Sequence, residues 1–195
     1  AEDTGLIVPI GKWVLETACA QLRQWHDAGH PALTLSVNVA TRQLRDKAFV
    51  ETVRQAIQTS GIPHRSLELE ITESILLENS EDTLSTLNAL KQLGVTLAID
   101  DFGTGYSSLS YLKRFPIDRV KIDRSFVRDL ASDSDDLAIV RAIIALAHAM
   151  RLSVIAEGVE TEAQLVLLQS EECHDYQGYF FSRPMDAESV YQKLL

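Results

Sequence analysis

Six short apolar runs in this chain each end in a polar or charged residue of a type that binds metal ions or phosphate. The residues that end them are Asn38, Glu70, Asp100 with Asp101, Lys121, Glu157 and Gln177. In a barrel of parallel strands the carboxyl ends of all strands open onto one face, so side chains far apart in sequence meet in one pocket. The four carboxylates, two amides and one ammonium group of this set would then form a divalent-metal site that acts on a phosphate ester.

The segments between these runs have the apolar spacing of helices. We predict helices over 11–28, 49–57, 80–93 and 139–150, a short helix between Ser107 and Pro116, and one that begins after Thr161. Ser80 begins the third of them and Gly94 ends it, while Thr161 with Gln164 has the pattern of a capping box. Helices that alternate with apolar strands indicate parallel pairing and right-handed crossovers.

Two architectures fit this order, an open doubly wound sheet and a closed barrel. An open sheet gathers its functional residues at one switch point, whereas nearly every strand end here carries a reactive group, which favours the barrel. Only six strands can be counted, and a barrel of this type needs eight. We therefore expect an α/β fold, a TIM-like barrel that forms one domain over residues 1–195 and lacks its first two strands in the sequence as given.

The composition argues against several classes of protein. A net charge of −10 disfavours a surface that coats a nucleic-acid polymer, because such a surface needs an excess of Lys and Arg. Two cysteines, Cys19 and Cys173, are too few for a disulfide framework or a zinc cluster and favour a reducing compartment. No apolar run approaches the roughly 20 residues that cross a bilayer. We therefore expect a soluble, cytoplasmic domain, also where the parent protein is anchored in a membrane.

Longer motifs surround the polar strand ends. They are Asn38-Val-Ala-Thr-Arg-Gln43, Glu70-Ile-Thr-Glu73, Asp100-Asp-Phe-Gly-Thr-Gly-Tyr-Ser-Ser108, Val120-Lys-Ile-Asp123, Glu157-Gly-Val-Glu160 and Gln177-Gly-Tyr179. In this order and spacing they resemble the successive signatures of the EAL domain family. The resemblance implies hydrolysis of the bacterial messenger cyclic di-GMP to linear pGpG, in a modified TIM barrel with two Mg²⁺ or Mn²⁺ ions. The partners implied are cyclic di-GMP, a second copy of the chain near the Asp101 loop, and an upstream sensor or GGDEF domain.

The Glu-Ala-Leu tripeptide that names the family is the departure from this pattern. Its Glu is a metal ligand in the family and is expected upstream of Asn38, yet the sequence contains no Glu-Ala-Leu, and Ala1 follows that place. A non-catalytic cyclic di-GMP receptor therefore stays open as the alternative to a phosphodiesterase. A third class, an unrelated barrel enzyme such as a metal-dependent lyase, would not explain the ordered motifs.

The resemblance also assigns the metal ligands. Asn38, Glu70 and Asp100 would hold one ion, and Asp100 with Asp101 would engage the second. Adjacent residues on a strand point to opposite faces, so both Asp side chains can serve one site only where the strand ends and turns. Glycines follow directly and permit such a turn.

The remaining residues of the set are expected to act in catalysis or to support it. Lys121 ends an apolar strand and needs a carboxylate or phosphate partner, so we expect it to position the attacking water or to stabilise the phosphoryl group. Gln177 would hydrogen-bond within the same network. Glu157 fits three roles that the sequence does not separate: direct metal ligand, ligand through water, and general base. Glu73 is expected to anchor the loop 102–108 rather than to touch an ion.

Other polar residues are expected to be structural. Asp118, Asp123 and the acidic run 133–136 are predicted to be solvated or capping acids. The five histidines have no metal-ligand spacing, and Cys173 is expected to be buried packing.

Overall fold

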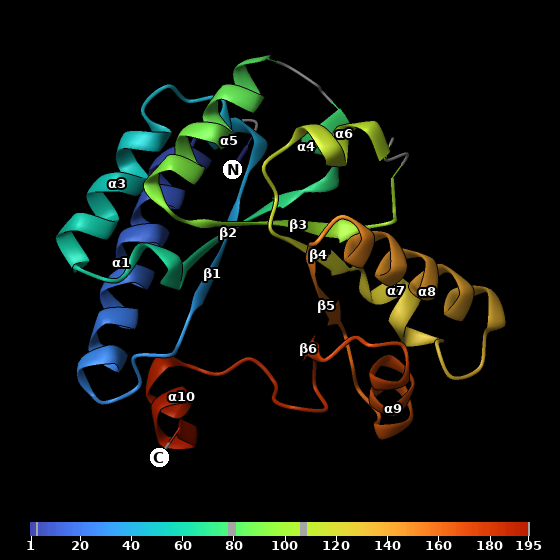
Figure 1. The fold of residues 1–195 in the computed structure, drawn as a ribbon. Coiled ribbons are helices and arrows are strands. Elements are labelled where there is room, and N and C mark those ends of the chain that lie inside the picture. Colours follow the sequence, from blue (N-terminus) through green and yellow to red (C-terminus); the bar gives the residue numbers. More distant parts are fainter. Residues whose placement is uncertain (3, 78–80, 106–108, 195) are drawn as a thin grey trace.

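One sheet of six parallel strands forms the centre of the molecule (Figure 1). The computed structural model describes residues 1–2, 4–77, 81–105 and 109–194. The strands are β1 (Leu35–Val39), β2 (Leu67–Thr72), β3 (Thr96–Phe102), β4 (Arg119–Ile122), β5 (Ser153–Glu157) and β6 (Asp175–Gln177). Each strand pairs in parallel with the next one along the chain.

Helices follow the strands and surround the sheet in Figure 1. They are α1 (Ile7–Asp27), α2 (Thr41–Leu44), α3 (Phe49–Ser60), α4 (Glu73–Leu77), α5 (Glu81–Leu93), α6 (Leu109–Arg114), α7 (Arg124–Arg128), α8 (Ser134–Ala149), α9 (Glu162–Ser170) and α10 (Ala187–Leu194), with a 3-10 helix η1 (His64–Ser66) before β2. All of the helices predicted from apolar spacing are present, whereas α2, α4, α7 and α10 were not predicted. The predicted helix-bounding residues Ser80 and Ser107 lie outside the described residues. In the described part of the chain, no helix is long and apolar enough to span a membrane.

Side chains of Asp133 and Thr161 cap the N-termini of α8 and α9. Asp133 accepts hydrogen bonds from the backbone N–H of Asp135 at 2.8 Å and of Asp136 at 3.5 Å, so α8 begins earlier than its apolar spacing alone predicts. Thr161 and Gln164 form the predicted capping box of α9. These findings confirm the capping roles predicted for Asp133 and for the Thr161 motif.

Asp118 is tied to the preceding helix and strand instead of being solvated or capping a helix. Its carboxylate accepts hydrogen bonds from Lys91 Nζ at 2.8 Å and from the backbone N–H of Leu97 at 2.8 Å. The acid thus links the end of α5, the start of β3 and the start of β4.

Alternation along the strands separates an apolar side of the sheet from a polar one. In β2, Leu69 and Ile71 are fully buried in the hydrophobic core, which includes Leu22 of α1, Leu87 of α5 and Val140 of α8. Full burial of each such side chain contributes about 1.5–3 kcal/mol to folding. The alternate residues of the same strand, Glu68 and Glu70, are charged and face the other way.

The sheet is an open, curled part of a TIM-like barrel. In the described residues, β1 and β6 each have a single strand neighbour, so these six strands do not close on themselves. The prediction of an incomplete TIM-like α/β barrel is confirmed.

Candidate active site

The polar residues that end the six apolar runs lie in the C-terminal parts of the strands, although β2 continues two residues past Glu70 and β3 one residue past Asp101. Asn38 lies opposite Glu70 in the pairing of β1 with β2, and Glu157 lies opposite Gln177 in the pairing of β5 with β6. The register between β3 and β4 shifts between Ile99 and Phe102, where the acidic pair Asp100-Asp101 lies. The parallel topology thus brings residues from all six strands to a common site.

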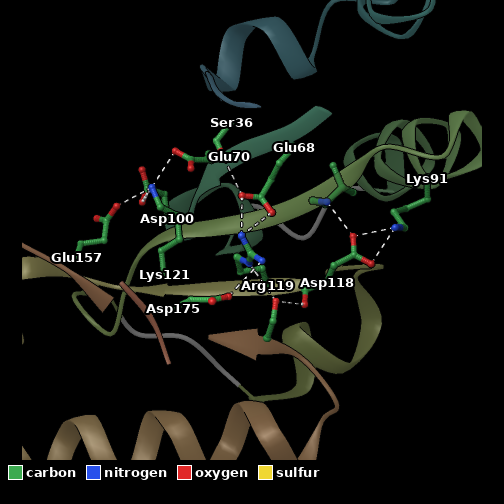
Figure 2. Close-up of polar contacts among 12 residues, drawn as sticks. Ser36, Glu68, Glu70, Lys91, Asp100, Asp118, Arg119, Lys121, Glu157 and Asp175 are labelled. Carbon is green, nitrogen blue, oxygen red and sulfur yellow. Dashed lines mark hydrogen bonds and ion pairs between the residues drawn. The ribbon is translucent and has the colours of Figure 1, made fainter. Parts of the chain in front are cut away.

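Lys121 is the centre of this site. Its side chain is 4% exposed, and its Nζ lies 2.8 Å from Glu70 Oε2, 2.8 Å from Asp100 Oδ1 and 2.7 Å from Glu157 Oε1 (Figure 2). Burial by itself lowers the pKa of Lys121, but the contacts with Asp100, Glu157 and Glu70 outweigh it, so the pKa is raised. The lysine therefore stays charged and draws three carboxylates of three other strands together.

The contact between Glu70 of β2 and Lys121 of β4 crosses the intervening strand β3. Glu70 and Lys121 lie on strands that are separated by β3, and the residue of β3 in register with Glu70 is Ala98. Ala98 is fully buried. In the pairing of β3 with β4, Ala98 lies opposite Arg119, two residues before Lys121, so the contact of Glu70 with Lys121 runs diagonally across β3.

Asp100, Asp101 and Glu157 form a candidate metal centre. Each offers a carboxylate oxygen, and these oxygens all lie within 4.8 Å of one another. Asp101 has φ +54°, in the left-handed region, so the strand turns there and both adjacent Asp side chains reach one site, as predicted. Asp100 Oδ1 is buried and has no hydrogen bond of full geometry, although Lys121 Nζ is close. An oxygen of this kind within an all-carboxylate cluster fits a hard divalent cation.

The charges of this cluster are not balanced by protein groups alone. Burial, then the charge of Asp100, raises the pKa of Asp101, and a hydrogen bond with Asp123 raises it further. Burial also raises the pKa of Glu157, against the opposing effect of Lys121. Burial is the main cause of both shifts, and the charge of Asp100 adds to each of them. The excess of negative charge is visible in the contacts of the described residues, where the single cation Lys121 meets three carboxylates.

Asp123 belongs to the site in addition to its capping role. It accepts a hydrogen bond from the backbone N–H of Ser125 at 2.9 Å and so begins α7, as predicted. Its carboxyl group also lies near that of Asp101 and raises the pKa of Asp101. The prediction gave Asp123 no part in the metal site, although its position two residues after Lys121 places it near the same strand end.

Glu73 at the start of α4 is buried and bonds to the loop after β3. Its Oε2 accepts hydrogen bonds from the backbone N–H of Gly103 at 2.9 Å and of Gly105 at 3.3 Å. A Cβ at Gly105 would lie 2.8 Å from Glu73 Oε1, so the loop approaches the carboxylate more closely than a side chain would permit. These contacts support the predicted anchoring role over 102–105, while 106–108 lie outside the described residues.

Gln177 and Asn38 lie at the two ends of the arrangement. Gln177 Nε2 donates a hydrogen bond to Glu157 Oε1 at 2.8 Å, so it joins the Lys121 network directly. Asn38 is exposed at the end of β1, beside Glu70 in the register. Every residue of the predicted set therefore lies along this edge of the sheet.

Comparison with known proteins identifies the fold and the motifs together. The family model of the EAL domain matches residues 1–184. This chain belongs to the EAL domain family. The chain is 48% identical over 190 residues to the bifunctional diguanylate cyclase/cyclic di-GMP phosphodiesterase MucR of Pseudomonas aeruginosa, and 47% identical over 185 residues to the cyclic di-GMP phosphodiesterase NbdA of the same species.

These EAL proteins are longer than the chain. The matches cover 97% and 95% of the chain but only 28% of MucR and 24% of NbdA. Among solved structures, the phosphodiesterase PaMucR in complex with c-di-GMP has a TM-score of 0.94 at 48% identity, with 97% of this chain and 77% of that chain covered. The FimX EAL domain from Pseudomonas aeruginosa bound to c-di-GMP has a TM-score of 0.86 at 26% identity, with 94% and 73% covered.

Proposed function

We propose that this EAL domain hydrolyses cyclic di-GMP to the linear dinucleotide pGpG. The observation that carries the proposal is the buried Lys121, held by three carboxylates beside the oxygen cluster of Asp100, Asp101 and Glu157. Relatives that are 43–48% identical are named as cyclic di-GMP phosphodiesterases. Catalysis is favoured over a purely receptor role by the presence of Asn38, Glu70, Asp100, Asp101, Lys121, Glu157 and Gln177.

The EAL phosphodiesterase family is metal-dependent, and the residues here fit hard cations. We assign the site to two Mg²⁺ or Mn²⁺ ions, with Asn38, Glu70, Asp100 and Asp101 as the ligands. All of these residues offer oxygen, the donor that both ions prefer. When bound, such ions supply an activated water and neutralise charge on the phosphoryl oxygens.

The protein's own groups have separate tasks in this proposal. The charged Lys121 stabilises the phosphoryl oxygens or holds the attacking water, because it is the one buried cation among the described groups that contact this cluster. Gln177 fixes Glu157 Oε1, which leaves the other oxygen of that carboxylate for the metal or for the water. Glu157→Gln separates the two roles, since lost Mn²⁺ affinity marks a ligand and a reduced kcat alone marks a proton acceptor.

A hollow next to the site has the chemistry to hold part of a nucleotide. Its volume is about 800 Å³, and it adjoins Gln177 and Glu160. Arg124 and Arg183 supply positive charge, and the ring of Tyr179 lies in the same wall. Guanidinium groups pair with phosphates and rings stack on bases, so the hollow supports a dinucleotide substrate.

A turnover assay with a matched binding assay tests the proposal. The protein at its natural length is incubated with cyclic di-GMP and Mg²⁺ or Mn²⁺, and pGpG is measured by chromatography. We expect pGpG with either ion and a much lower rate with Ca²⁺, which is larger and looser in geometry. Binding of cyclic di-GMP without any pGpG would instead establish the receptor function.

Family membership also suggests the compartment, the neighbouring domains and the oligomeric state. We propose that the domain acts in the cytoplasm, together with a sensor or GGDEF domain in the same polypeptide, and as a homodimer. The MucR relative, which is named as both a cyclase and a phosphodiesterase, supports such a combination. Analytical ultracentrifugation of the natural-length protein tests the dimer.

A further inference from the structure

Gln164 uses its entire hydrogen-bonding capacity inside the protein. The residue is 5% exposed, in the first turn of α9. Its Oε1 accepts from the backbone N–H of Glu160 at 2.8 Å and of Thr161 at 2.9 Å, which is the capping box. Its Nε2 donates to the carbonyl oxygens of Val127 at 3.1 Å and of Arg128 at 2.9 Å. The second pair of bonds has no part in capping α9, because Val127 and Arg128 belong to α7.

These bonds join two segments that leave the candidate active site. The loop 158–161 directly follows Glu157 at the end of β5, and α7 directly follows Asp123 after β4. The same two segments touch at Gly158, where φ is +71° and an added Cβ would lie 2.7 Å from Cβ of Arg124. The loop after β5 is thus pressed against the start of α7 and bonded to its end.

The other side of this loop is fixed by the chain after β6. The backbone N–H of Val159 donates to the carbonyl oxygen of Gln177 at 3.1 Å, and the carbonyl oxygen of Val159 accepts from the N–H of Phe180 at 2.9 Å. A Cβ at Gly178 would lie 2.1 Å from the Val159 oxygen, so only glycine permits this approach. Gln164 joins this loop to α7, because its Oε1 accepts from the loop at Glu160 and Thr161 while its Nε2 donates to Val127 and Arg128.

We propose that Gln164 is a positioning residue for Glu157: its side-chain amide fixes the loop after β5 to the end of α7 and so sets the Glu157 carboxylate against Lys121 and the metal centre. The inference rests on the proposed function, since it assigns a support to the same site. When residues that hold metal ligands in place without binding the metal are replaced, metal affinity or activity typically falls by about 10–100-fold.

Gln164→Glu isolates this role from the capping of α9. A carboxylate of the same shape still accepts from the N–H groups of Glu160 and Thr161, and a negative charge is favourable at a helix N-terminus. The variant loses both donors, and it places an oxygen against the carbonyl oxygens of Val127 and Arg128. The cap is kept while the bond to α7 is broken.

Two control variants separate positioning from stability. Gln169→Glu makes the same change on an exposed face of the same helix. Thr161→Ala removes the hydroxyl that accepts from the Gln164 N–H at 3.3 Å, so it weakens the cap and leaves the link to α7 intact. A residue that only stabilised α9 would make Gln164→Glu and Thr161→Ala behave alike.

The first measurement does not depend on activity. Hydrogen exchange of the metal-free protein at natural length is followed at the backbone amides of 157–161. We expect Gln164→Glu to speed exchange at Val159 about tenfold, and Gln169→Glu to leave it unchanged. The second measurement is a Mn²⁺ titration of cyclic di-GMP hydrolysis, in which Gln164→Glu raises the half-saturating Mn²⁺ concentration about tenfold and Thr161→Ala does not.

The outcomes separate this inference from the proposed function. If the unmodified protein makes no pGpG, the proposed function fails, and the exchange data alone decide whether Gln164 holds the loop. If the unmodified protein is active and Gln164→Glu matches Gln169→Glu in both measurements, the positioning role is overturned. Equal effects of Gln164→Glu and Thr161→Ala also overturn it. Should Gln164→Glu fail to fold, Gln164→Asn, which is one methylene shorter, replaces it under the same two criteria.

Discussion

Two ionic clusters lie on the same face of the sheet, one around Lys121 and one around Arg119, two residues earlier on β4 (Figure 2). They differ in how their charges are balanced. In the site, one ammonium group of Lys121 meets three carboxylates at 2.7–2.8 Å. In the neighbouring cluster, Arg119 meets Glu68 at 3.4 Å and Asp175 at 3.6 Å, with its side chain 27% exposed.

The neighbouring cluster is satisfied by groups of the protein and by water. Ser36 donates a hydrogen bond to Glu68 at 2.8 Å, and Arg119 donates one to Ser153 at 3.0 Å. Asp175 is more than half exposed, so solvent compensates its charge. The comparison teaches that an ion pair whose remaining charge is exposed to solvent braces the strands, whereas an excess of buried carboxylates marks the place for a cation.

Replacing the central lysine should have the largest effect. Lys121→Met leaves Glu70, Asp100 and Glu157 without their shared cation, which should cost about 3–5 kcal/mol of unfolding free energy in metal-free buffer and abolish turnover. Saturating Mn²⁺ should recover part of the stability, because a cation again offsets the carboxylates. Urea denaturation with and without Mn²⁺ measures this, and an unchanged midpoint without metal would show that Lys121 does not balance the cluster.

Removal of one site carboxylate should affect activity far more than folding. Asp100→Asn takes away an oxygen that lacks a full hydrogen bond, so the fold should tolerate the change while turnover falls about 10²–10³-fold. Asp101→Asn should behave in the same way. Steady-state kinetics and circular dichroism of both variants provide the check, and a rate within twofold of the unmodified protein would remove these residues from the site.

Replacing Glu73, which anchors the loop 102–105, should have a smaller effect on turnover. Glu73→Gln keeps one oxygen that can accept from both glycine N–H groups but loses the charge that strengthens both bonds, so we expect turnover to fall about tenfold through a looser loop 102–105. Faster hydrogen exchange at Gly103 should accompany the loss. Reduced turnover with unchanged protection at Gly103 would show that Glu73 acts by some other route.

Replacing Arg119 of the neighbouring cluster should affect catalysis least. Arg119→Met leaves Glu68 with Ser36 as its partner, and we expect it to cost about 1–3 kcal/mol of unfolding free energy. Turnover at saturating metal should stay within about threefold, because the cluster around Arg119 contributes no group to the reaction. A hundredfold loss of kcat in a folded variant would erase the distinction between the two clusters.

The sequence was sufficient for the strands and for the residue types at their ends. The apolar runs that end at Asn38, Glu70 and Glu157 mark the strands, and parallel topology then brings their C-terminal parts together. The exact ends were wrong for β1, which continues one residue past Asn38, and for β2, which continues two residues past Glu70. Short helices such as α7 and α4 were missed because about one turn of helix contains too few residues to show a period.

Contacts between elements distant in sequence could not be predicted. The approach of Glu70 to Lys121 runs diagonally across β3, where Ala98 lies in register with Glu70 and with Arg119, and register is a property of the folded sheet. Gln164 is recognisable as a capping residue, yet its bonds to α7 require the packing of α9 beside that helix. The second contact of Asp123, with Asp101, depends in the same way on the turn at φ +54°.

An anomalous-scattering map of crystals grown with Mn²⁺ and measured near the manganese edge tests the central claim most directly. The claim is that the unbalanced carboxylates form the metal centre, whereas the cluster around Arg119 does not. We predict strong peaks with oxygens of Asp100 and Asp101 at about 2.1 Å, close to the ideal ligand distance, and none beside Glu68. Crystals in saturating Mn²⁺ without a peak at Asp100 and Asp101, or with the main peak elsewhere, would contradict the account.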